Sequence, residues 1–166
     1  MLIALALMLG LPVMAQSETR SEDMATIEQI ETHRLAPRAL TPFVNSRDST
    51  VRARSARALG RMGNPGGLPP LRMLLSDPVA EVRSEAAFAM GLIPGGGQSL
   101  LDRLSVESDP AVRALLIEAI GRSCDSKACV EGVQWTLSEE PVGLKPSPLR
   151  EKASVAIGRM AYRKVP

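Results

Sequence analysis

A twelve-residue pattern recurs four times in this chain and constrains its fold more than any other feature. The copies align without internal gaps and start at Val51, Val82, Val112 and Leu149, so successive copies begin 31, 30 and 37 residues apart. The second place of every copy is Arg, the eighth is Ala and the tenth is Gly. Repeats with a period of roughly 20–50 residues are typical of solenoids, in which one small structural unit stacks on the next.

Each copy has the spacing of an amphipathic α-helix. Small and apolar residues recur at intervals of three and four positions, which places them on one side of a helix. The Gly of the tenth place lies inside this helix, where it costs about 1 kcal/mol relative to Ala. We therefore expect it to permit close approach of a neighbouring helix. In the order of the copies, these residues are Gly60, Gly91, Gly121 and Gly158.

Signals that start a helix precede three of the copies. An Asp stands shortly before each of them, where its carboxylate can accept hydrogen bonds from the first backbone N–H groups and oppose the helix dipole. Pro78 and Pro110 follow two of these residues and are predicted at the first helical position. The predicted caps are Asp48, Asp77 and Asp109.

Shorter apolar segments lie between the copies and complete a unit of two helices. We expect these helices at 36–44, 68–75, 98–106 and 128–137, separated by loops rich in Gly and Pro, and a further helix from about Asp23 to Arg34. Only four of the 166 residues are aromatic, which argues against most β-sandwiches and barrels. Because one helix pair cannot bury its apolar face, the sequence predicts an all-α solenoid of about four pairs with an extra N-terminal helix.

These helix pairs resemble HEAT repeats of the short, phycobilisome-lyase-like kind, whose second helix opens D-P-x-x-x-V-R and continues A-x-x-A-L-G. The copy from Asp77 to Gly91 is the most similar, and the resemblance covers roughly residues 38–160. The fourth copy departs from it, with Leu149 in the first place and a Pro-rich insertion at 139–148. The sequence is also similar to the repeats that precede a cyclophilin-like isomerase domain in some bacterial exported proteins. No such domain is recognisable here, so that activity is not expected.

The resemblance implies a protein-binding scaffold without catalytic activity. It assigns a structural ladder to the Arg of the second place and the capping Asp residues, so we expect binding at the variable fourth, seventh and eleventh places, on the concave face. Phe88, Leu92 and Leu115 are the expected apolar anchors, with Arg at their edges. The alternative is that these side chains only cover one another. The predicted partner-binding residues are Arg54, Arg57, Arg61, Phe88, Leu92, Leu115, Glu118 and Arg122.

Charge is distributed unevenly along the chain. Residues 16–33 carry a net charge of −4 and residues 34–72 a net charge of +7. The basic segment, with Arg47 and the three predicted Arg of the first copy, is suited to an acidic protein, anionic lipid or polyanion. We favour the alternative that the acidic segment folds back over it as an internal counter-charge. The acidic residues concerned are Glu18, Glu22, Asp23, Glu28 and Glu31.

The first fifteen residues, Met1 to Ala15, carry no charged side chain and end in small residues suited to cleavage before Gln16, as in a secretory signal peptide. An uncleaved anchor and a buried first helix are the alternatives, although the segment is too short to span a bilayer. We therefore expect an exported, periplasmic or secreted protein with a leader at 16–34 and a solenoid at 35–166. In that setting Cys124 and Cys129 are expected to form a disulfide, the alternative being free buried thiols.

Few residues suit catalysis. His33 is the single imidazole, so neither a nucleophile–base pair nor a metal site is expected, and no cofactor is predicted. Iron-dependent deoxyhypusine hydroxylases of related fold carry His-Glu pairs, whereas Arg34 follows His33 here. A bilin-lyase-like chromophore-binding protein is an alternative, as is a HEAT-like DNA glycosylase if the chain is not exported. The preferred prediction is a monomer with a protein partner, for which the basic segment suggests an acidic protein, and no nucleic-acid ligand or stable membrane span.

Overall fold

Every regular element in the described residues is helical, as predicted. The computed structural model describes residues 3–124, 126–138 and 148–162. Its elements are α1 (Ile3–Thr32), η1 (Pro37–Leu40), α2 (Thr41–Val44), α3 (Ser49–Met62), η2 (Pro65–Gly67), α4 (Leu68–Leu74), α5 (Ala80–Met90), α6 (Gly97–Leu104), α7 (Pro110–Ser123), α8 (Lys127–Ser138) and α9 (Pro148–Tyr162).

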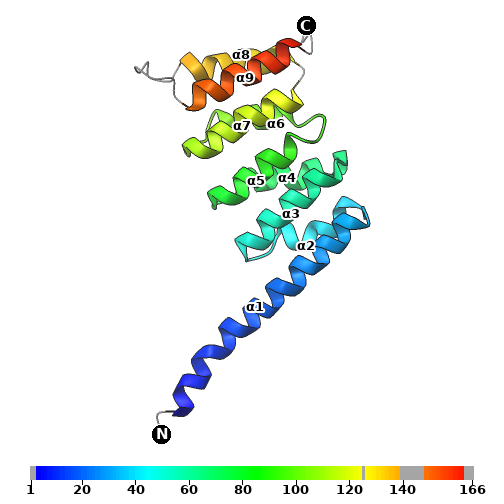
Figure 1. Ribbon diagram of the computed structural model, residues 1–166, viewed down its shortest axis with the longest axis vertical. Helices are drawn as coiled ribbons and strands as arrows, with labels where there is room; N and C mark the ends of the chain where they lie inside the picture. The colour runs from blue at the N-terminus through cyan, green and yellow to red at the C-terminus, as the bar shows by residue number, and fades with distance from the viewer. Residues whose placement is uncertain (1–2, 125, 139–147, 163–166) are drawn as a thin grey trace.

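The helices form two layers in a stack. The long helices α3, α5, α7 and α9 pack in succession, and the short helices α2, α4, α6 and α8 accompany them in a second layer (Figure 1). The four predicted pairs are therefore confirmed, with one difference in the first. The expected helix at 36–44 is divided into η1 and α2, because Pro37 and Pro42 each suit only the first turn of a helix. The Pro-rich insertion at 139–148 lies outside the described residues except for Pro148.

The repeated Gly and Ala residues form the contacts between successive long helices. A Cβ atom added to Gly60 would lie 2.6 Å from Cα of Ala89, and one added to Gly91 would lie 2.9 Å from Cα of Ala119. The third contact repeats this geometry, with Gly121 against Ala156 at 2.7 Å. The tenth place of each helix thus meets the eighth place of the next, and the predicted close approach is confirmed.

The prediction of three capping Asp residues is correct for two. Asp48 accepts from the backbone N–H of Thr50 at 2.8 Å, and Asp109 accepts from those of the first turn of α7, which begins at Pro110. Asp77 is not a cap, because it stands five residues before its copy, whereas Asp48 and Asp109 stand three before theirs. The N-cap of α5 is Val79, so Pro78 precedes the helix instead of opening it.

The N-terminal helix is longer than expected. The predicted start was about Asp23, but α1 begins at Ile3 and ends at Thr32, and its N-terminal half projects beyond the stack (Figure 1). Ile27 and Ile30, in its C-terminal half, are buried against the solenoid. No helix in the described residues is both long enough and apolar enough to cross a membrane. Cleavage before Gln16, and with it the division of the chain at that point, stays a prediction.

A disulfide joins the third helix pair to the fourth. Cys124 follows α7 directly, and Cys129 lies in the first turn of α8, with their Cα atoms 6.3 Å apart. Both residues are buried, and the Ser126 hydroxyl lies 3.5 Å from each sulfur. The expected disulfide is therefore present, and the alternative of free thiols is not.

Candidate protein interface

The Arg of the second place links consecutive helix pairs. Arg52 donates to Asp77 through Nε at 2.7 Å and Nη2 at 3.0 Å, and its Nη1 donates to the Ser46 carbonyl at 2.8 Å. The guanidinium of Arg52 therefore links the loop before α3, which contains Ser46, to the loop before α5, which contains Asp77. Such two-pronged pairing fixes geometry as well as charge. The structural role expected for these Arg residues is confirmed at this position.

These Arg–carboxylate pairs form a ladder in which each rung joins the Arg of one copy to a carboxylate before the next. The carboxylate of the second rung is Glu107, which the sequence interpretation missed. Arg83 donates to Glu107 through Nε at 2.8 Å and Nη2 at 3.0 Å, while the predicted partner Asp109 serves only as a helix cap. The signal was present in the alignment, because Asp77 and Glu107 both stand five residues before their copies. For the third rung, the position five residues before the copy is Leu144, which carries no carboxylate and lies outside the described residues.

The predicted binding residues gather at one surface pocket. The pocket has a volume of about 370 Å³ and lies where α3, α5 and α7 meet. Five of the eight predicted residues line it, and Arg54, Glu118 and Arg122 lie on the same helices. The guanidinium of Arg122 sits 4.9 Å from the ring centroid of Phe88. The residues lining the pocket are Arg57, Arg61, Ser84, Glu85, Phe88, Leu92 and Leu115.

We call the surface formed by the fourth, seventh and eleventh places of α3, α5, α7 and α9 the long-helix face. Its seventh places pair with the fourth places of the next helix. Arg57 donates to Glu85 at 3.0 Å, and Lys152 donates to Glu118 at 2.6 Å. Between these two ion pairs, Phe88 and Leu115 occupy the same two places and line the pocket. The alternative that these side chains cover one another thus holds for the charged pairs, whereas the apolar pair borders open space.

The acidic N-terminal segment neutralises part of the basic first copy. Glu31 of α1 pairs with Arg54 at 2.6 Å and with Arg61 at 3.2 Å. Burial opposes ionisation of Glu31, but the hydrogen bonds and charges of these two Arg residues lower its pKa below the ordinary value. The expected internal counter-charge is therefore present, supplied by one of the five acidic residues considered.

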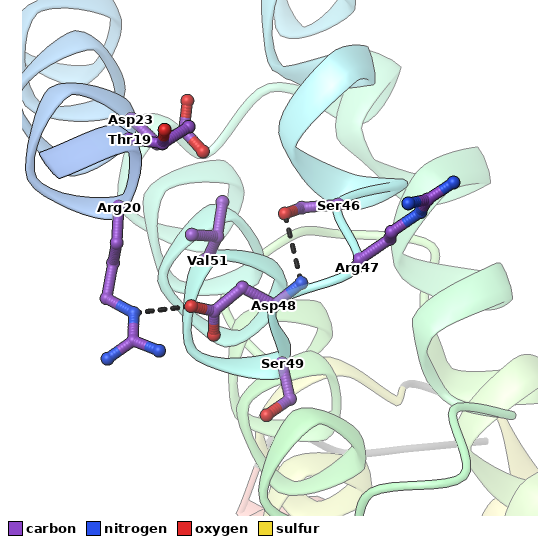
Figure 2. Close-up of a pocket in the computed structure, with 8 residues that line it drawn as sticks. All are labelled: Thr19, Arg20, Asp23, Ser46, Arg47, Asp48, Ser49 and Val51. Atoms are coloured by element: carbon purple, nitrogen blue, oxygen red, sulfur yellow. Dashed lines mark hydrogen bonds and ion pairs between the residues drawn. The ribbon is translucent and has the colours of Figure 1, made fainter. Parts of the chain in front are cut away.

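A second pocket, of about 620 Å³, lies between α1 and the start of α3. Figure 2 shows Arg20 of α1 reaching Asp48, while Arg47 points away from that pair. Both carboxylate oxygens of Asp48 are engaged, one by Arg20 and the other by the N–H of Thr50. The ion pair between Arg20 and Asp48 therefore joins α1 to the start of α3. Because these two charges are paired within the chain, we do not assign a ligand to this pocket. The lining residues are Thr19, Arg20, Asp23, Ser46, Arg47, Asp48, Ser49 and Val51.

Comparison with known families agrees with this architecture. The stacked pairs define an all-α solenoid, and residues 25–96 match the family of HEAT repeats, over less than half of the chain. Over these residues the chain is similar to HEAT repeats, and the stacking of its helix pairs agrees with that similarity. A comparison with curated proteins gave no significant match. The finer resemblances, to lyase-like repeats and to repeats of exported isomerases, stay predictions.

Proposed function

We propose that this chain is a non-catalytic protein-interaction module that binds its partner on the long-helix face. HEAT repeats generally mediate contacts between proteins, and a stack of helix pairs offers an extended surface for them. The observation that carries the proposal is the pocket at Phe88. Here three apolar side chains, Phe88, Leu92 and Leu115, border open space between two Arg side chains.

The composition of this pocket favours a protein partner. Interfaces are enriched in aromatic residues and Arg, and their energetic centres are apolar side chains in pockets from which the complex excludes water. Phe88 carries Arg122 against its ring, and Arg57 and Arg61 stand at the pocket edge. For DNA the balance is less favourable, because three apolar side chains and Glu85 line the pocket, whereas a phosphate backbone is bound mainly by Lys and Arg.

We further propose that the protein is exported. A disulfide persists in oxidising compartments and is rare in the reducing cytosol, which supports this location for a chain with Cys124 and Cys129 bonded. Mass spectrometry of the protein recovered from fractionated cells tests the proposal. We expect a mature N-terminus at Gln16 in the exported fraction, and an intact Met1 confined to the cytosol would contradict it.

The interface is tested by substitution on two sides of the stack. Leu115→Asp places a charge in the pocket, and Met73→Asp places one on an exposed position of α4, in the other layer. After circular dichroism has established that both variants fold, crosslinking and mass spectrometry compare the partners captured by each purified chain. We expect Leu115→Asp to lose partners that the parent and Met73→Asp retain. Equal capture by all three proteins would overturn the proposal.

A further inference from the structure

Three ion pairs of the long-helix face are unequal in exposure, whereas the pairs of Arg54 with Glu31 and of Arg122 with Glu118 have similar exposures, 22% and 16% in the first and 24% and 22% in the second. In the pair of Arg57 with Glu85, the Arg side chain is 47% exposed and the carboxylate side chain 19%. The pair of Arg61 with Glu31 repeats this, at 56% and 16%. The cationic member therefore faces solvent in both pairs, while the carboxylate is withdrawn beneath it.

The same inequality continues beyond the pocket. Lys152 is 48% exposed and its partner Glu118 is 22% exposed. Glu118 also accepts from Arg122 at 3.1 Å, so two cations share one withdrawn carboxylate. The hydrogen bond from Lys152 lowers the pKa of Glu118, which keeps that carboxylate ionised and bound to its cations. At these three pairs an approaching molecule thus meets the guanidinium or ammonium group before the carboxylate that is paired with it.

We infer that the pocket accepts a peptide segment in which an apolar side chain is flanked by Asp or Glu residues. The apolar side chain would lie against Phe88, Leu92 and Leu115, and the carboxylates would reach Arg57 and Arg61 at the pocket edge. This inference rests on the proposed function and adds the chemistry of the partner.

Existing pairs need not break when such a peptide binds. A guanidinium carries five N–H donors, so Arg57 can keep its two bonds to Glu85 and still donate to an incoming carboxylate. A basic peptide would instead have to displace an Arg in order to reach Glu85 or Glu31. The face therefore selects for acidic segments by charge and for apolar side chains by the pocket between the charges.

A peptide-display selection on the purified full chain tests this inference. Random peptides are selected in parallel on the parent and on Leu115→Asp. We expect the parent to enrich peptides that combine an apolar residue with neighbouring Asp or Glu, and Leu115→Asp to lose them. Pocket-dependent peptides that are neutral or basic would overturn the inference but leave the proposed function standing. Enrichment that is the same on both proteins, or none on either, would overturn both.

A quantitative measurement then isolates the charge. One enriched peptide is labelled, and its affinity is measured by fluorescence anisotropy against the parent, Arg61→Gln and Arg72→Gln. Arg72 is an exposed Arg on α4 in the other layer and is the matched control. We expect about tenfold weaker binding to Arg61→Gln, because a charged hydrogen bond is lost, and unchanged binding to Arg72→Gln. Equal affinity for all three proteins would contradict a role for the cationic edge.

Discussion

At the scale of single residues, Glu107 is the carboxylate that accepts the most hydrogen bonds in the described part of the chain. It accepts from Arg83, from Arg103 Nη2 at 2.7 Å and from the backbone N–H of Asp109 at 2.9 Å, and its side chain is fully buried. A buried carboxylate is costly unless it is paired and hydrogen-bonded. Here burial raises the pKa of Glu107, but the hydrogen bonds from Arg83, Asp109 and Arg103 outweigh it and lower that pKa to about 2.

Glu107 should therefore make the fold sensitive to acid. Its folded pKa lies below the ordinary value of 4.5, so its contribution is complete above pH 4.5 and is lost as the pH falls toward about 2. We expect Glu107→Gln to lower the free energy of unfolding by roughly 3 kcal/mol at neutral pH. The difference from the parent should shrink across that acidic range in urea titrations.

Glu131→Gln is the control for this pH dependence. Glu131 is exposed on α8 and pairs with Lys127 at 3.4 Å, so its loss should change stability little at any pH. A difference between the parent and Glu107→Gln that stays constant from neutral pH to pH 2 would show that Glu107 is not held ionised by its partners.

At the scale of helices, the stack depends on a residue that weakens the isolated helix. An interior Gly costs about 1 kcal/mol relative to Ala, yet three of the four Gly residues meet the backbone of the next helix, where no Cβ fits. At Gly158, the same place in α9, no described residue outside the adjoining backbone of that helix has a heavy atom within 4 Å of the Cβ position. Wherever another long helix packs after the one that holds the Gly, close packing between the two helices thus outweighs the low helix propensity of Gly.

Substitution by Ala should have opposite effects at a Gly that packs against the next helix and at Gly158, which does not. Gly91→Ala places a Cβ 2.9 Å from Cα of Ala119 and should destabilise the protein by about 1–3 kcal/mol. Gly158→Ala should be neutral or should stabilise it by up to about 1 kcal/mol, because only helix propensity changes. Thermal unfolding followed by circular dichroism compares the two variants. The same loss in both would mean that close approach does not explain the repeated Gly.

At the scale of the whole molecule, each helix packs on elements from its own or an adjacent pair. The long helices contact in the order α1, α3, α5, α7, α9, and among the short helices α2 contacts α4 and α6 contacts α8. In such a stack the free energy of unfolding is approximately the sum of the stability of each helix pair and of its interfaces with adjacent pairs. A substitution that destabilises one pair should therefore affect mainly the adjacent pairs. The disulfide between α7 and α8 offers a way to test this.

Replacing both Cys124 and Cys129 by Ser should loosen one end of the stack only. Opening a loop with a sequence separation of 5 residues costs about 2 kcal/mol in the chain-entropy estimate. We expect hydrogen–deuterium exchange to accelerate in α8 and α9 and to stay unchanged in α3 and α5. Faster exchange throughout the chain would show that the solenoid unfolds as one cooperative unit.

The limits of sequence interpretation follow from the range of the interactions involved. The alignment predicted helix pairs because helical periodicity is local, and it predicted the role of Gly because the cost of Gly inside a helix demands a compensating contact. It wrongly assigned Asp77 as a cap, because Asp77 stands two residues further from its copy than Asp48 and Asp109 do and so lies in the preceding loop. It also placed the start of α1 about 20 residues too late. Residues 1–15 were left out of the predicted helix because they were assigned to a targeting signal, and that signal stays a prediction, since a targeting segment can itself be helical.

The sequence by itself determined the period, the two alternating helices and the columns of small residues, because each depends on spacing along one short segment. Only the tertiary structure decided which carboxylate an Arg of one helix binds on another element, since those partners lie 23 to 30 residues apart in the chain. It also decided which charge faces solvent on the long-helix face, because the exposure of an ion pair depends on how neighbouring helices stack around it.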